Sequence, residues 1–94
     1  MKKIWKYSLG QLNSVRDSQH KVVVSVKVGA RPLCVGMHSG ICCVWAEVEP
    51  EAPEINVTFF SVGTGHGVVP GRNTYLGTVI DGDYVWHVYH NLTY

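Results

Sequence analysis

Apolar and polar residues alternate with a period of two along most of this chain, and this alternation limits the fold more than any other feature. The valines at positions 22, 24, 26 and 28 share one side of an extended segment, whereas Ser25 and Lys27 face the other way. Successive side chains of a strand point to opposite faces, so the pattern predicts a strand with one buried face. No segment of ten or more residues has the 3.6-residue period of an amphipathic helix. The sequence therefore predicts an all-β protein.

Six segments have the aromatic and β-branched composition of strands. They are residues 3–9, 22–28, 41–48, 55–62, 74–80 and 84–90. Asp81-Gly82, between the last two, predicts a hairpin with a type I′ turn. The weak alternation of Leu12, Ser14 and Arg16 leaves open a short edge strand or a single helical turn. We expect one domain over residues 1–94, a small antiparallel sandwich or barrel of six or seven short strands.

Charge is divided unevenly along the chain, although the net charge is only +1. Residues 1–31 carry seven Lys and Arg against one Asp, and residues 32–94 carry one Arg against six Asp and Glu. The two parts interleave in a compact fold, so this asymmetry is typical of a solvated basic strand, and a nucleic-acid partner is not expected. The first residues do not resemble a signal peptide, and no apolar run approaches the ~20 residues that span a bilayer. We therefore expect no membrane partner.

Histidines and cysteines invite a metal site, but their spacing argues against one. His87 and His90 are three residues apart, and on a strand such residues point to opposite faces. The adjacent Cys42 and Cys43 diverge in the same way. An odd number of cysteines fits a reducing compartment. The chain also has no local signature of a catalytic nucleophile and no motif of paired carboxylates. We expect no metal, no cofactor and no catalytic residue, and hence a protein that is not an enzyme.

The glycine-rich stretch VGTGHGVVPGR at residues 62–72 is the best candidate for a ligand site. Its candidate residues are Gly63, Thr64, Gly65, His66, Gly67 and Arg72. Glycine lets a ligand approach the backbone closely, and successive N–H groups can form an anion-binding nest. His66 and Arg72 would then contact a phosphate. A dinucleotide site is excluded because no helix follows the strand. The alternative is a long hairpin loop that needs several positive φ angles, in which His66 caps backbone groups.

Aromatic residues on the strands add candidates for stacking against a base. Val44 and Ala46 have the pattern of core residues, which places Trp45 on the opposite face. Trp45 is therefore a candidate for a stacking surface or for an anchor in a protein interface. Tyr75 is the second stacking candidate. Trp86 lies on a strand with apolar residues on both faces, which is typical of a central strand.

Five motifs follow one another along nearly the whole chain: K-x-I-W-K-Y, G-I-C-C-V-W-A-E-V-E-P, F-F-S-V-G-T-G-H, Y-L-G-T-V and V-W-H-V-Y. Together they resemble a family of small proteins of this length that are encoded mostly by bacteriophages. The family is classified as a domain of unknown function. The resemblance implies a phage origin and a setting in the host cytoplasm. The matching positions include Trp5, Trp45, Pro50, Gly63, Thr64, Gly65, His66, Gly77, Trp86 and His87.

These observations lead us to expect a phage accessory protein that acts by binding. The first hypothesis is a counter-defence protein that sequesters a nucleotide immune signal, or another phosphate-bearing small molecule, at a site between the copies of a homo-oligomer. The second is a protein-interaction module that inhibits a host defence protein. The third is a minor component of the virion.

Overall fold

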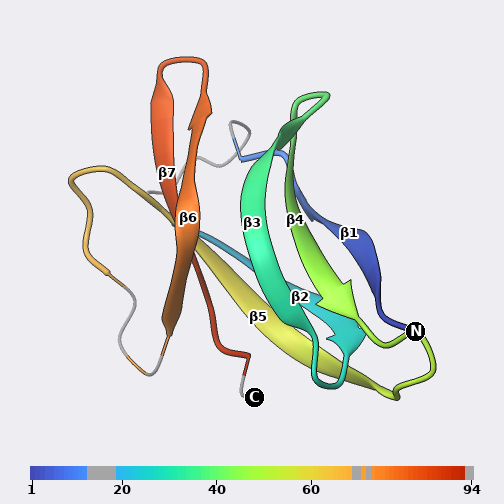
Figure 1. Cartoon of the computed structure of the whole chain (residues 1–94). Coiled ribbons are helices and arrows are strands. Elements are labelled where there is room, and N and C mark those ends of the chain that lie inside the picture. The colour runs from blue at the N-terminus through green and yellow to red at the C-terminus, as the bar shows by residue number, and fades with distance from the viewer. Residues whose placement is uncertain (13–18, 69–70, 72, 93–94) are drawn as a thin grey trace.

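The residues that the structure describes form seven strands in two antiparallel sheets that pack as a sandwich (Figure 1). The structure is a computed structural model and describes residues 1–12, 19–68, 71 and 73–92. One sheet has the strand order β1-β4-β3 and the other the order β2-β5-β7-β6. The strands are β1 Lys3–Gly10, β2 Gln19–Lys27, β3 Arg31–His38, β4 Ile41–Val48, β5 Glu54–Gly63, β6 Thr74–Asp81 and β7 Tyr84–His90. The predicted all-β antiparallel fold is confirmed. Among the described residues, no helix is long and apolar enough to cross a membrane.

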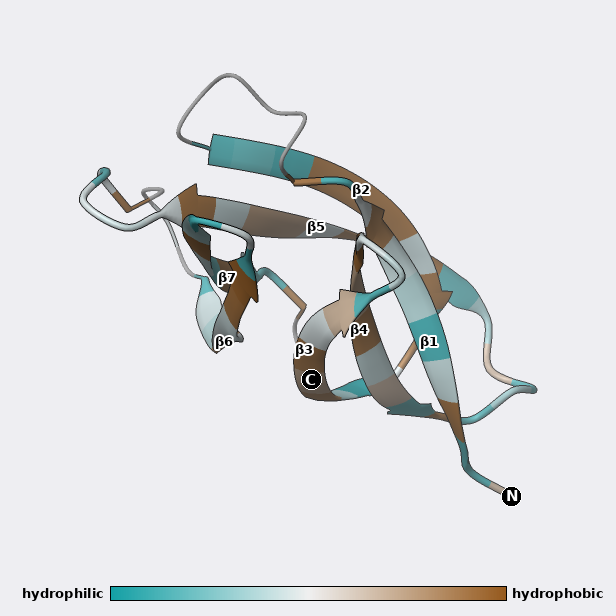
Figure 2. Cartoon of the chain, turned by 90° about the horizontal axis from the view of Figure 1, so that it is seen from above, coloured by the Kyte–Doolittle hydropathy of each residue, from teal (hydrophilic) through white to brown (hydrophobic). Residues whose placement is uncertain are grey.

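The core lies between the two sheets and is built from the inward-facing half of each alternating pattern. Val44, Ala46 and Val48 of β4 are buried, as their spacing predicts. Val57 and Phe59 of β5 face them from the other sheet and belong to the same cluster. Figure 2 shows hydrophobic residues on the strands of both sheets. Burying this shared apolar surface stabilises the sandwich by roughly 25 cal/mol for each Å² removed from water.

Strand β3 was not predicted, and its composition explains why. Pro32 and Gly36 interrupt the alternation, and Pro32 cannot donate a hydrogen bond to a neighbouring strand. β3 tolerates this proline because it lies at the edge of its sheet. Its register with β4 also shifts between Pro32 and Cys34. The seventh strand is therefore β3, while most of the weak segment at residues 12–16, including Ser14 and Arg16, lies outside the described residues.

The predicted hairpin at Asp81-Gly82 is present, but the prediction of a type I′ turn is wrong. Asp81 pairs with Tyr84, so Gly82 and Asp83 form a two-residue loop. Gly82 has φ of 62°, and Ser39 is the one non-glycine residue with positive φ in the described ranges. A type I′ turn needs positive φ at both central residues, whereas a type II′ turn needs it only at the first. The β6–β7 turn therefore has the type II′ pattern.

The glycine-rich stretch is not a hairpin loop. β5 and β6 both pair antiparallel with β7, which lies between them, so β5 and β6 run parallel to each other. The end of β5 and the start of β6 therefore lie at opposite ends of the sheet, on either side of β7. The inward side of β7 is filled by the core side chains of Trp86 and Val88. Residues 64–68 leave the end of β5 on the side away from β3 and β4 (Figure 1).

Candidate functional site

A tight turn opens the β5–β6 connection and uses two of its backbone donors. The His66 N–H donates to the Gly63 carbonyl at 3.2 Å. Gly65, the third residue of this turn, has φ of 90°, which is the glycine position of a type II turn. The Thr64 N–H donates to the Val85 carbonyl, also at 3.2 Å. Because both amides are already bonded within the protein, the residues 63–67 do not present a run of free N–H groups to an anion.

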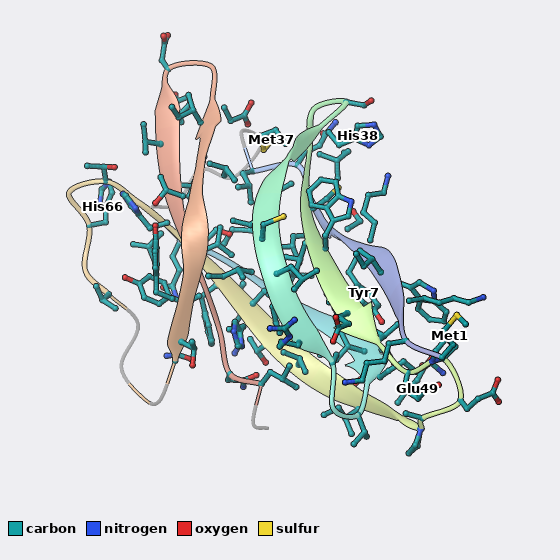
Figure 3. All side chains as sticks on the ribbon, in the orientation of Figure 1. Met1, Tyr7, Met37, His38, Glu49 and His66 are labelled. Atoms are coloured by element: carbon teal, nitrogen blue, oxygen red, sulfur yellow. The ribbon has the colours of Figure 1, made fainter. Side chains whose placement is uncertain are left out.

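The remaining predicted site residues fall into two groups. His66 and Gly67 are exposed, and His66 lies on the outward side of the four-stranded sheet (Figure 3). Trp45 is on the other sheet, where it pairs with Lys6 of β1 and Cys34 of β3 and is partly buried.

Arg72 lies outside the described residues. Of the predicted residues, Thr64 and Tyr75 lie on one surface of the four-stranded sheet, whereas Trp45 lies on the other sheet.

Thr64 and Tyr75 are joined by a continuous series of hydrogen bonds through two residues that the sequence analysis did not single out as ligands. The Thr64 Oγ1 lies 2.8 Å from His87 Nε2, and His87 Nδ1 lies 3.0 Å from Thr78 Oγ1. The Thr78 Oγ1 in turn lies 2.5 Å from the Tyr75 hydroxyl. We call Thr64, His87 and Thr78 the polar row. It runs from Thr64, the residue after β5, to His87 of β7 and Thr78 of β6 on the outward face of the sheet.

An irregularity in β6 makes the polar row possible. Tyr75 and Thr78 are three residues apart, and in a regular strand they would point to opposite faces. The register of β6 on β7 shifts between Tyr75 and Gly77, as in a β-bulge. Tyr75 consequently pairs with Tyr89, and Thr78 pairs with His87. His87 and Tyr89 are two residues apart on β7, so all four side chains reach the same face.

Three aromatic side chains form a second row beside the first. Phe60 of β5 pairs with Tyr89 of β7, and Tyr89 pairs with Tyr75 of β6. The rings of Tyr75 and Tyr89 meet edge to face, with centroids 5.5 Å apart. We call Phe60, Tyr89 and Tyr75 the aromatic row. Lys21 of β2, which is exposed, pairs with Phe60 and places a cation at the end of this row.

The sequence contained only part of the signal for this surface. His87 is one of the positions that match the family pattern, but from the sequence it was considered, together with His90, only as a possible metal ligand. The structure places the two histidines on opposite faces, as predicted, with His90 buried against Phe59. No sequence pattern pointed to Thr78, because the face on which it lies depends on the register shift between Tyr75 and Gly77 in β6. The outward placement of Tyr89 could have been read from its alternation with the buried Val88.

Comparison with known proteins places the chain in a family. A family model described as a domain of unknown function, DUF7352, matches residues 1–93. The chain belongs to the DUF7352 family. No curated protein and no solved structure matches it. For this DUF7352 protein the candidate site therefore rests on its geometry, which combines the polar row, the aromatic row and Lys21.

Proposed function

We propose that this DUF7352 protein acts by binding and that its ligand is a nucleotide whose base stacks on the aromatic row. The observation that carries the proposal is the alignment of Phe60, Tyr89 and Tyr75 across three adjacent strands. Neighbouring strands are about 4.8 Å apart, so the row is roughly 10 Å long, the size of a purine. Stacking of a base on an aromatic side chain contributes about 1–3 kcal/mol.

Two further features support a nucleotide over a purely apolar ligand. Tyr75 is 53% exposed, so a ligand ring has access to it from solvent. Lys21 at the other end of the row supplies a cation for a phosphate group. The polar row lies next to the aromatic row and offers oxygen atoms to the edge of a stacked base. This combination of stacking surface, polar edge and cation is the usual chemistry of nucleotide recognition.

The biological role that we propose for such binding is counter-defence. A phage protein in the host cytoplasm that sequesters a nucleotide signal would need affinity and no catalysis. The support for this setting is the resemblance to phage-encoded proteins. A homo-oligomer, with the β5–β6 connection of one copy near the next, would enclose the ligand further.

Titration with a panel of linear and cyclic nucleotides, followed by thermal shift and calorimetry, tests the proposal. We expect at least one nucleotide to bind. Tyr89→Ala should weaken that binding by at least about fivefold, because it removes a stacking ring. Lys21→Ala should weaken it too, and more so at low salt. Trp45→Ala, an aromatic truncation on the other sheet, is the matched control and should leave the affinity unchanged. Absence of any shift across the panel would exclude a nucleotide ligand.

A second candidate function, a protein-interaction module, is favoured by the outward face of the three-stranded sheet. Ile4 is 63% exposed and Leu33 41% exposed, and Trp45 lies between their strands. Exposed apolar side chains on the strands beside a tryptophan are typical of a protein contact. Affinity capture from host lysate should then recover one dominant partner that Trp45→Ala loses and Tyr89→Ala keeps. The reverse result would assign the contact to the four-stranded sheet.

A further inference from the structure

The hydrogen bonds of the polar row run in one direction in the arrangement that keeps every contact, including the one from Thr64 to the Val85 carbonyl. The Thr64 hydroxyl donates to the Val85 carbonyl at 3.4 Å. A hydroxyl has a single hydrogen, so Thr64 must accept from His87, which therefore carries a hydrogen on Nε2. A neutral imidazole has only one N–H, so His87 Nδ1 accepts from Thr78.

The same argument extends to the end of the series. Since Thr78 uses its hydrogen on His87, it must accept from the Tyr75 hydroxyl. In this arrangement each donor is used once, and all four contacts are made. With the neutral hydrogen on Nδ1, the single hydrogen of Thr64 would have to serve both His87 and the Val85 carbonyl, and one contact would be lost. We therefore infer the Nε2–H tautomer for neutral His87.

This direction determines what the surface offers to a ligand. The hydroxyl hydrogens of Thr64, Thr78 and Tyr75 all point into the protein, and only oxygen lone pairs remain on the outside. Thr64, Thr78 and Tyr75 are all exposed. A ligand beside them gains a hydrogen bond if it brings an N–H, and it leaves an acceptor unpaired if it brings a carbonyl or a ring nitrogen.

We propose that the polar row selects bases that carry an exocyclic amino group. The inference rests on the proposed function and specifies its ligand class. Tyr75 connects the two rows, because its ring belongs to the aromatic row and its hydroxyl bonds to Thr78. His87 and Tyr89 are two residues apart on β7, which is roughly 7 Å. A base stacked over the aromatic row therefore brings its edge substituents over the polar row.

The test compares two ligands that differ in one amino group, adenosine 5′-monophosphate and purine riboside 5′-monophosphate. Calorimetry on the full chain should show the amino-bearing nucleotide binding about tenfold more tightly, since a matched hydrogen bond in such a site contributes about one factor of ten. Tyr75→Phe keeps the stacking ring and removes the acceptor, so the ratio should fall below about threefold. Tyr84→Phe makes the same change at an exposed tyrosine outside both rows and should leave the ratio intact.

The outcomes separate this inference from the proposed function. Equal affinities, or tighter binding of purine riboside 5′-monophosphate, would overturn amino-group selection while leaving nucleotide binding in place. Binding of neither compound would overturn amino-group selection, and the proposed function would fall with it only if no nucleotide of the panel binds.

An independent measurement needs no ligand. Nitrogen-15 spectra of the histidine rings should show His87 as the Nε2–H tautomer at neutral pH. The Nδ1–H form would reverse the direction of the hydrogen bonds in the polar row and exclude the proposal.

Discussion

The two histidines of β7 differ in role because they occupy opposite faces of one strand. His90 is 1% exposed, and its Nδ1 accepts the Leu92 N–H at 3.1 Å. Burial holds the pKa of His90 below its ordinary value of 6.5. His87 lies on the outward face within the polar row. Alternation along the strand predicted this division, whereas the hydrogen-bond partners of His87 depend on the shift in β6 and had no counterpart in the sequence.

The buried imidazole predicts how stability depends on acid. Because the pKa of His90 is lower in the folded state, the unfolded chain binds more protons below pH 6.5. The stability from neutral His90 is therefore complete above that pH and is lost as the pH falls from 6.5 toward the lowered value. Urea unfolding at intervals between pH 7.5 and 5.5 measures this loss, and His90→Gln should flatten the slope. An identical slope in the variant would assign the pH dependence to other groups.

At the scale of elements, a close approach joins the two sheets where β3 faces β6. A Cβ added at Gly77 would lie 2.8 Å from Val35 Cγ1, which is closer than carbon atoms pack. Gly77→Ala should therefore lower the free energy of unfolding by about 1–3 kcal/mol, because either β6 or the stiff Val35 must move. Chemical denaturation measures the loss.

Two variants separate this clash from a general effect of replacing glycine. Val35→Ala in the Gly77→Ala background should recover part of the loss. Gly67→Ala, where an added Cβ meets nothing within 4 Å, should change stability little. A strong effect at Gly67 with no coupling between Gly77 and Val35 would contradict a steric cause.

The elements also show the limit of local sequence patterns. Each predicted strand has the alternation that one buried face imposes, and these strands are present. The partners of a strand are set by contacts between distant segments, so the insertion of β7 between β5 and β6 was not predictable from either neighbour. For this reason the glycine-rich stretch at residues 62–72 was open to interpretation as a long hairpin loop. β3 was missed because Pro32 and Gly36 remove the local signal at an edge.

At the scale of the whole molecule, the charge asymmetry of the sequence becomes a set of contacts. The basic N-terminal part meets acidic residues of β4, of β5 and of the segment between them. Glu47 lies 3.6 Å from Lys2 and 3.5 Å from Arg31, and Glu54 lies 3.4 Å from Lys27. In the described part of the chain the two oppositely charged parts therefore interleave, as expected.

The two pairs of Glu47 lie near the surface and should contribute little to stability. Glu47→Gln removes the acid shared by Lys2 and Arg31, and we expect it to lower the free energy of unfolding by less than about 1 kcal/mol. The difference should shrink as sodium chloride is raised, because salt screens exposed charges. Paired denaturant titrations at low and high salt measure it. A larger loss that salt does not change would indicate a packing role for Glu47.

The position of β7 between two parallel neighbours also constrains the order in which the protein folds. β5 and β6 are separated by the width of a strand, about 10 Å, and form no hydrogen bonds with each other. Within its sheet β6 therefore gains a partner only when β7 forms, and β7 follows both neighbours in the chain. The four-stranded sheet cannot be assembled strand by strand as the chain emerges. Its closure is a late event that depends on contacts distant in sequence, which is characteristic of β proteins that fold in milliseconds to seconds.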